Sequence, residues 1–350
     1  IFSFGSINID EVYSVPHIVR PGETLSSTKR QQHAGGKGAN ASVAAARAGG
    51  NVFTVGKIGP DGLWVRDLIN SSGANTEHIS VVTDALTARA IIQVDAQGEN
   101  SIVLFPGTND LLTEEDAKKA FAQSSPGDWL LLTNGITGVA EAIRLAHEKG
   151  MRILWNAAPM ASDMIAKGEP VDLVDVLVVN ETELCGLAEQ LEDIDIEEKC
   201  LDKQKCMEVA RQVMKRLGNQ VIAVTLGKEG SVALVRRSKT DMHAIPTSST
   251  DTKQFGNEIE DDDIAEISMR CAPVATQLIR DTTGAGDTWV GYFAAELART
   301  QGNSPESIGS LASLTPAMVE QSMFIATFAS GLTVTRMGAM PSIPEREEVE

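Results

Sequence analysis

Asp281–Thr288 (DTTGAGDT) runs directly into the apolar segment Trp289–Leu297 (WVGYFAAEL). Small residues followed by a helical apolar pattern predict a tight turn that opens a helix. The first N–H groups of a helix have no partners within it, and with the helix dipole they favour a bound anion. Asp287 would repel that anion unless it acts as a base, so the segment indicates phosphoryl transfer to a hydroxyl. The alternative is that Gly284 and Gly286 only shape a turn and that Asp287 caps the helix.

A second glycine-rich turn opens another predicted helix near the N-terminus. Residues 35–40 are GGKGAN, and an alanine-rich segment follows up to Gly49 and Gly50. The order of Gly and Lys fits neither a dinucleotide fingerprint nor a P-loop, since no Ser or Thr follows Lys37. Asn40 offers a donor and an acceptor to a hydroxylated ligand. The alternative is close packing of a helix on a strand, with Lys37 in solvent.

Together the two motifs resemble the paired signatures of the PfkB (ribokinase-like) family of carbohydrate kinases. Four further segments support the resemblance in order and spacing: Gly5–Asp10 (GSINID), Arg20–Leu25 (RPGETL), Asn180–Glu183 (NETE) and Val334–Ser342 (VTRMGAMPS). The resemblance implies ATP-dependent phosphorylation of the primary hydroxyl of D-ribose to D-ribose 5-phosphate, with Mg²⁺ and with K⁺ as a monovalent activator. Two alternatives stay open: a kinase for adenosine, fructose or ketodeoxygluconate, and a non-catalytic sugar or nucleotide sensor.

The resemblance also implies a role for each matching residue. Asp287 is the expected general base, and the expected anion hole is formed by Gly284, Ala285 and Gly286. The sugar is expected to contact Asn8, Asp10, Gly36, Lys37, Gly38, Asn40 and Asp287. ATP is expected at Asn180, Glu183, Thr225, Gly227, Gly230, Gly286 and Thr327, with Glu183 reaching Mg²⁺ through water. The monovalent cation is expected at Asp281, Thr283, Thr333, Arg336, Gly338 and Ser342, mostly through backbone carbonyls. For Asp281 the alternative is a turn cap.

One position departs from the pattern of bacterial relatives. These relatives place a Glu that contacts ribose shortly after the strand predicted at Trp129–Thr133, whereas this chain has Gly135 there. The neighbouring Asn134 is the side chain available to replace that contact. The departure bears on which sugar is bound and leaves sugar phosphorylation itself untouched.

Short apolar strands alternate with helical segments along the chain. The strands are expected at Ile1–Gly5, Asn51–Ile58, Trp129–Thr133, Arg152–Asn156, Val174–Val179 and Val221–Thr225. Helical periodicity marks Trp64–Ser72, Ala140–Lys149 and Lys205–Leu217. This alternation predicts an α/β fold with a doubly wound, mostly parallel sheet flanked by helices.

Alternating polarity near Ser14–Ser27 and Thr87–Leu104 predicts half-exposed antiparallel strands instead. The resemblance implies that these build a small antiparallel β lid over the sugar, formed by residues of about 11–34 and 84–107. The length of the chain allows one large α/β domain with a small appendage as readily as two domains, and we expect a single domain over residues 1–350. By analogy we also expect a homodimer formed through the lid, since exposed sheet edges invite pairing.

The composition restricts the partners. The net charge of −18 argues against a nucleic acid or an anionic membrane surface, and no apolar run approaches a membrane span. Cys185, Cys200, Cys206 and Cys271 have no metal-type spacing, so we expect free thiols in the cytoplasm, or in the nucleus of a eukaryote. We expect a mobile acidic insertion at about 238–279, and a metal-binding or regulatory role for it is the alternative.

Overall fold

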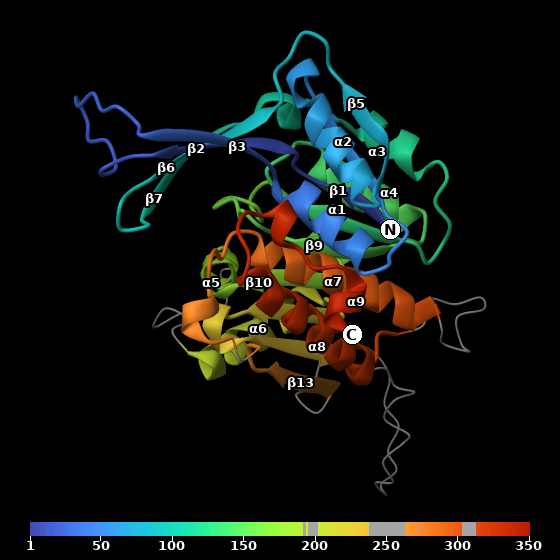
Figure 1. Cartoon of the computed structure of the whole chain (residues 1–350). Coiled ribbons are helices and arrows are strands. Elements are labelled where there is room, and N and C mark those ends of the chain that lie inside the picture. The colour runs from blue at the N-terminus through green and yellow to red at the C-terminus, as the bar shows by residue number, and fades with distance from the viewer. Residues whose placement is uncertain (192–193, 195–201, 238–262, 273, 303–312) are drawn as a thin grey trace, which may run out of the picture.

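The computed structural model describes residues 1–191, 194, 202–237, 263–272, 274–302 and 313–350 (Figure 1). The strands are β1 (Phe2–Phe4), β2 (Asn8–Ser14), β3 (Lys29–Gly35), β4 (Phe53–Ile58), β5 (Asn75–Val81), β6 (Ala88–Val94), β7 (Asn100–Phe105), β8 (Trp129–Thr133), β9 (Arg152–Asn156), β10 (Val176–Asn180), β11 (Val221–Thr225), β12 (Ser231–Arg236) and β13 (Ile264–Met269). The α-helices are α1 (Lys37–Arg47), α2 (Leu63–Ser71), α3 (Glu114–Phe121), α4 (Val139–Glu148), α5 (Glu181–Glu189), α6 (Lys203–Leu217), α7 (Ala285–Gly302), α8 (Pro316–Thr333) and α9 (Arg346–Val349).

The larger sheet has nine strands in the order β13-β12-β11-β10-β9-β8-β1-β4-β5. The seven strands from β11 to β5 run parallel, while β12 and β13 extend the edge in antiparallel fashion. This confirms the predicted mostly parallel, doubly wound sheet. The prediction of a mobile insertion at 238–279 is wrong at its C-terminal part, because residues 264–269 form β13. Residues 238–262 of that segment lie outside the described ranges.

The smaller sheet, β3-β2-β6-β7, projects from the body as an arm (Figure 1). It consists of two antiparallel hairpins, β2–β3 and β6–β7, whose inner strands β2 and β6 run parallel to each other. The strands predicted near Thr87–Leu104 are present as β6 and β7. The strands predicted near Ser14–Ser27 are misplaced, because that segment connects β2 to β3. Pro16 and Pro21 lie in this connection, and proline cannot donate a ladder hydrogen bond.

Each face of the large sheet carries its own hydrophobic core. Along β8 to β11, successive side chains point to opposite faces, so Leu131 and Leu154 pack with α1, α7 and α8, whereas Leu130 and Trp155 pack with α3 to α6. These strands are buried on both faces. Their continuous apolar runs made them easy to predict.

Helices α1 and α7 touch almost backbone to backbone. A Cβ atom placed on Gly291 of α7 would lie 2.4 Å from the carbonyl oxygen of Ala41 and 2.5 Å from the Cβ of Ala44. The first turn of α1 is equally tight against β1, since a Cβ on Gly38 would lie 2.4 Å from the carbonyl carbon of Gly5. These contacts fix the N-termini of α1 and α7 relative to the end of β1.

Two further expectations concern cysteines and membranes. Cys185 is disulfide-bonded, so the expectation of free thiols is wrong for this residue. Cys206 and Cys271 keep their thiols, and Cys200 lies outside the described residues. Among the described residues, no helix is both long enough and apolar enough to cross a membrane.

Gly291→Ala should destabilise the protein because the added methyl group overpacks the contact between α1 and α7. Overpacking of this kind typically costs about 1–3 kcal/mol, measured as a lower midpoint of urea unfolding at constant slope. Gly186→Ala in α5 is the matched control. Its Cβ would meet nothing closer than the Met160 sulfur at 3.9 Å, and alanine favours a helix interior by roughly 0.5–1 kcal/mol. Equal stability of Gly291→Ala and the wild type would contradict this account of the packing.

Candidate active site

Most predicted site residues lie where strands of the large sheet end. Gly5 and Ser6 follow β1, and Asn180 is paired in register with Thr225 at the ends of β10 and β11. In parallel sheets the carboxyl ends of the strands share one edge, where ligands bind. The glycine-rich starts of α1 and α7 reach the same edge, next to the base of the smaller sheet (Figure 1).

Asp287 is buried in the first turn of α7, with 7% of its surface exposed. The Asn40 side chain of α1 donates a hydrogen bond of 2.7 Å from Nδ2 to Asp287 Oδ2. The Lys37 ammonium lies 3.8 Å from Oδ1. Asn40 Oδ1 is buried without a protein partner among the described residues. The two glycine motifs, 247 residues apart, therefore meet in one polar cluster.

The predicted anion hole is at the very start of α7. The first helical hydrogen bond runs from Thr288 N to the carbonyl oxygen of Gly284 at 2.8 Å, so the N–H groups of Gly286 and Asp287 come before it. Ala285 N donates to the Thr282 carbonyl at 3.3 Å. A Cβ on Gly286 would meet nothing within 4 Å. An anion therefore has room to approach the backbone at Gly286.

Asp10 projects from β2 against a glycine of the neighbouring strand. A Cβ on Gly35 in β3 would lie 2.1 Å from Asp10 Oδ2, so a side chain there would displace this carboxylate. Asn8 lies two residues earlier on the same face of β2, and its Oδ1 accepts a hydrogen bond of 2.9 Å from Asn109 Nδ2. Asn8 and Asp10 thus present an amide and a carboxylate side by side.

Gly36 and Gly38 allow the start of α1 to lie close to the backbone that follows β1. Gly36 has φ of +91°, and a Cβ there would lie 2.5 Å from the Ser6 carbonyl oxygen. Ala39 N donates to that same oxygen at 3.0 Å, which ties the start of α1 to the chain after β1. A side chain at Gly36 is strained in conformation and blocked in space.

The predicted nucleotide residues fall into three local arrangements. Asn180 and Glu183 form a reciprocal cap at the start of α5, with bonds of 2.8 and 2.9 Å. Gly227 and Gly230 shape the turn after β11, both with positive φ. Thr327 in α8 is buried and accepts a hydrogen bond of 3.2 Å from Trp289 Nε1, so its hydroxyl already has a structural partner.

Most of the predicted cation residues occupy two adjoining loops, whereas Thr333 is the last residue of α8. Asp281 joins them, because its carboxylate accepts from Thr283 N and from Gly338 N, each at 2.9 Å. The Thr333 and Ser342 hydroxyls donate to backbone oxygens, and the Arg336 side chain pairs with Glu348. The side chains of Thr333, Arg336 and Ser342 therefore already have partners within the protein.

Both ends of the Asn134 side-chain amide are hydrogen-bonded within the protein. Its Oδ1 accepts from Trp155 Nε1 at 2.8 Å, and its Nδ2 donates to the Pro159 carbonyl at 3.0 Å. Gly135 has φ of +81°, and a Cβ there would lie 3.7 Å from the Ser6 Cβ. Gly135, the position that differs from the bacterial relatives, therefore adjoins the site. Asn134 is held by hydrogen bonds to β9 and to the loop that follows β9.

Three carboxylates and one lysine set the charge of this site. Burial, and next the charge of Asp287, raise the pKa of Asp10 to about 6. Burial also raises the pKa of Glu183, and there the attraction of Lys37 acts against the repulsion of Asp287. The site therefore carries an excess of negative charge, which suits a ligand that brings cations. Within the described ranges, no three His, Cys, Asp or Glu side chains gather to hold a metal ion by themselves.

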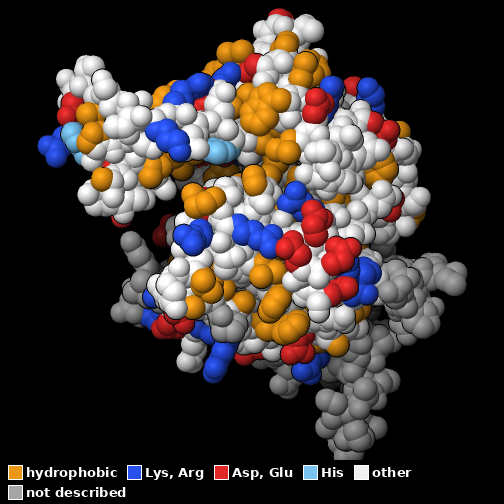
Figure 2. Space-filling model, viewed as in Figure 1, with side chains coloured by type: hydrophobic (Ala, Val, Ile, Leu, Met, Phe, Trp, Pro, Cys, Tyr) orange, Lys and Arg blue, Asp and Glu red, His pale blue; other side chains and the backbone are white. Residues whose placement is uncertain are grey.

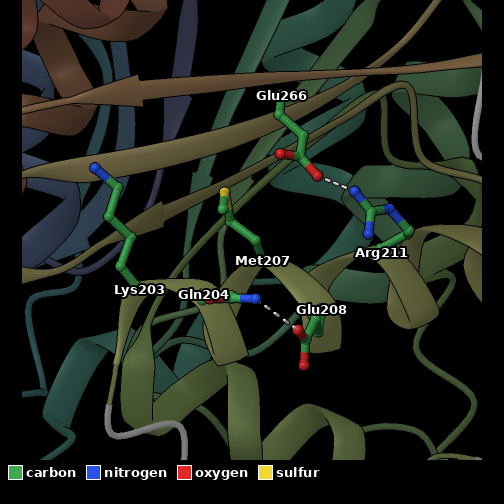
Figure 3. A pocket seen from close by; sticks show the side chains of 6 residues that line it. All are labelled: Lys203, Gln204, Met207, Glu208, Arg211 and Glu266. Carbon is green, nitrogen blue, oxygen red and sulfur yellow. Dashed lines mark hydrogen bonds and ion pairs between the residues drawn. The ribbon is translucent and has the colours of Figure 1, made fainter.

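A hollow of about 320 Å³ lies elsewhere, between α6 and β13 (Figure 3). Its walls include Met207, Glu208 and the ion pair of Arg211 with Glu266. None of the predicted site residues lines it, so the hollow has no part in the candidate site.

Sequence reasoning missed two residues of the site. Gly35 belongs to the recognised glycine motif, but the need for glycine there arises only from the pairing of β3 with β2. Asn109 is 2% exposed and orients Asn8 from 101 residues away. No spacing in the sequence indicates either contact, although the surrounding Gly107–Asn109 turn is marked by its glycine.

Asp10→Asn should stabilise the protein at alkaline pH. The pKa of Asp10 rises from the ordinary 3.8 to about 6 in the folded state. Between these values the folded protein keeps a proton that the unfolded chain has lost, so stability falls as the pH rises from about 4 to about 6 and stays lower above. The neutral variant should gain up to about 3 kcal/mol at about pH 8 and almost nothing near pH 4.

Urea unfolding at these two pH values measures the gain, with the exposed Asp84→Asn as the control. A gain of the same size under acidic and alkaline conditions would show that packing, and not charge, is responsible.

Comparison with known proteins gives consistent findings. The profile of the pfkB family of carbohydrate kinases matches residues 1–253. The chain is 33% identical to the ribokinase of Haemophilus influenzae over 348 residues, which are 98% of this chain and 95% of that protein. The ribokinase of Cryptococcus neoformans var. grubii serotype A, crystallised in complex with ADP, has a TM-score of 0.74 at 31% identity, covering 99% of this chain and 97% of that one.

A ribokinase structure from Thermotoga maritima has a TM-score of 0.72 at 27% identity, again covering 99% and 97% of the two chains. The fold is therefore shared along nearly the whole chain. On the profile match and the near-complete coverage of a relative at 33% identity, this chain belongs to the pfkB family of carbohydrate kinases.

Proposed function

We propose that this chain is an ATP-dependent sugar kinase that transfers the γ-phosphoryl group to the primary hydroxyl of D-ribose, giving D-ribose 5-phosphate. One observation carries the proposal. Asp287 is a buried carboxylate at the start of α7, held at 2.7 Å by Asn40 and flanked by Lys37 and Asp10. A base beside unsatisfied helical N–H groups is the arrangement that phosphoryl transfer to an alcohol needs.

In the proposed reaction, Asp287 takes the proton of the sugar hydroxyl as its oxygen forms a bond to the γ-phosphorus. The bond between that phosphorus and the bridging oxygen of ADP breaks. The N–H groups at the start of α7 face the charge of the transferred group, and donors of this kind are worth roughly a hundredfold or more in rate. Asn40 keeps the Asp287 carboxylate directed at the sugar.

Mg²⁺ fits the residues present. Magnesium is usually held by one or two carboxylates together with substrate phosphates and waters, and this site offers the Glu183 carboxylate near an excess of negative charge. When bound with ATP, Mg²⁺ neutralises charge on the phosphates. We propose Asn180, Glu183, Thr225, Gly227, Gly230 and Thr327 as the nucleotide side of the site.

We also propose a K⁺ site in the loops joined by Asp281. The support is the bridge that this carboxylate makes between Thr283 N and Gly338 N, directly before the start of α7. A cation among the backbone carbonyls of these loops would order the anion hole. K⁺ should therefore raise kcat.

The similarity to ribokinases, together with the amide of Asn8 and the carboxylate of Asp10, supports ribose as the sugar. Adjacent hydroxyls of a sugar can use both groups. Kinase action on adenosine, fructose or ketodeoxygluconate remains the alternative substrate choice. The observation that favours this alternative is Gly135, which stands where bacterial relatives have a Glu that contacts ribose.

The smaller sheet supports a proposed homodimer. Its edge strand β7 exposes four consecutive hydrophobic side chains, Ile102–Phe105, at 44–61%, and Figure 2 shows hydrophobic side chains over this projecting arm. Unprotected edges of this kind pair with other strands. Light scattering should give twice the chain mass, and Val103→Asp should give the mass of one chain. A monomeric wild type at micromolar concentration would overturn the dimer.

We place the kinase in the cytoplasm, or in the nucleus of a eukaryote, where its ATP is available.

Asp287→Asn should abolish most catalysis while leaving ligand binding. Loss of a general base typically costs roughly 10²–10⁴ in rate, and the amide keeps the size of the carboxylate. The measurement is ADP release with Mg²⁺–ATP on ribose, deoxyribose, fructose, adenosine and ketodeoxygluconate, in K⁺ and in Na⁺. The exposed Asp84→Asn is the control and should retain full activity.

The outcomes separate the alternatives. Turnover on ribose that is stimulated by K⁺ and lost in Asp287→Asn supports the proposal. Turnover on another member of the panel keeps the mechanism and changes the substrate. ATP binding without turnover on any sugar would favour the sensor and overturn the kinase.

A further inference from the structure

A buried asparagine that lies outside the predicted site contacts the side chain of Asn8, a residue of that site. Asn109 lies in the turn after β7 and is 2% exposed. Its Oδ1 is 3.2 Å from Ile7 N, and its Nδ2 is 2.9 Å from Asn8 Oδ1. Both contacts reach the segment between β1 and the start of β2, 102 and 101 residues earlier in the chain.

The backbone fixes which end of each amide is which. Ile7 N–H can only donate, so the Asn109 atom that faces it must be the oxygen. The other end of Asn109 is then the NH₂ group, which donates, so the Asn8 atom that faces it must also be an oxygen. The Asn8 NH₂ group is the end left for a ligand. We propose that Asn109 is a positioning residue that fixes Asn8 as a hydrogen-bond donor to the sugar.

The turn around Asn109 is rigid enough for this task. Asn109 N donates to the Pro106 carbonyl at 3.0 Å, and Thr137 N donates to the Asn109 carbonyl at 3.2 Å. Gly107 has φ of +49°, and a Cβ there would lie 2.6 Å from the Leu86 carbonyl oxygen. The backbone N–H and the backbone carbonyl of Asn109 are thus both hydrogen-bonded.

The consequence concerns substrate recognition, and it rests on the proposed function. Asn8 as a donor and Asp10 as an acceptor stand two residues apart on the same face of β2. A sugar hydroxyl can accept from Asn8 while it donates to Asp10. Were the Asn8 amide reversed, the hydroxyl would meet two acceptors with a single proton, and one acceptor would stay unsatisfied.

Asn109→Asp reverses the Asn8 amide with almost no change of size at the substituted position. A carboxylate cannot donate to Asn8 Oδ1, so the Asn8 side chain turns and donates to the introduced carboxylate, which leaves the Asn8 oxygen for the sugar. The KM for the sugar should rise roughly tenfold to a hundredfold, while the KM for ATP stays within about twofold. The exposed Asn70→Asp is the matched control and should change neither constant.

A second variant tests the same point without disturbing the buried turn. In Asn8→Asp, one carboxylate oxygen still accepts from Asn109, and the other presents an acceptor in place of the donor. It should raise the sugar KM as Asn109→Asp does. This arm remains informative if Asn109→Asp does not fold.

Nuclear magnetic resonance of the protein labelled with ¹⁵N-asparagine gives a readout that needs no sugar. The Asn8 side-chain resonances are assigned by their loss in Asn8→Asp. In Asn109→Asp, one Asn8 amide proton should shift downfield because it now donates to a carboxylate. Asn70→Asp should leave the resonance in place.

The two readouts separate failure of this inference from failure of the proposed function. An unshifted Asn8 resonance, or an unchanged sugar KM in a folded Asn109→Asp, overturns the role of Asn109 even if ribose is phosphorylated. A shifted resonance in a protein that phosphorylates no sugar supports the positioning by Asn109 and rejects the sugar kinase.

Discussion

The contact between α1 and α7 is the constraint on which the site depends. Each helix begins in a glycine-rich turn, but neither turn alone places Asn40 beside Asp287. Gly291 lets the two backbones touch, and Gly38 sets the start of α1 against β1. The N-termini of both helices then point to one place, and Asn40 and Asp287 come within hydrogen-bonding distance. The close packing of α1 on α7 and the contact between Asn40 and Asp287 both depend on glycines, which have no side chain.

The charge of the site follows from this geometry. The charge of Asp287 influences both Asp10 and Glu183, while the Lys37 ammonium attracts Glu183 and lies 3.8 Å from the Asp287 carboxylate. Burial makes each extra negative charge costly, so the pKa of Asp10 rises. A cation bound together with nucleotide phosphates would relieve this repulsion. We infer that the unliganded site is destabilised by its own charges, which is common where binding and catalysis are performed.

Much of the fold could be predicted because its signals are local. The strands β8 to β11 are short apolar runs buried on both faces, and the helices α2, α4 and α6 have clear periodicity. The edge strand β13 was missed because it follows an acidic run and exposes Glu266. In the smaller sheet, β2 begins with the polar Asn8 and Asp10, so its start was not recognised as a strand.

The site was predictable only in part for a related reason. The glycine motifs mark the starts of α1 and α7, so Asp287 and Asn40 could be named from the sequence and its resemblance. The need for Gly35 arises from strand pairing, and the role of Asn109 arises from a contact across 101 residues. Such requirements are properties of the folded chain, and a pattern of neighbouring residues does not carry them.

A crystal structure with D-ribose and a non-hydrolysable ATP analogue tests the central claim most directly. The measured quantity is the distance from the Asp287 carboxylate to each sugar hydroxyl. We predict that the primary hydroxyl lies within hydrogen-bond reach of Asp287, about 3 Å away, with the terminal phosphate at the start of α7. A different hydroxyl beside Asp287, or a sugar bound away from α1 and α7, would contradict the account.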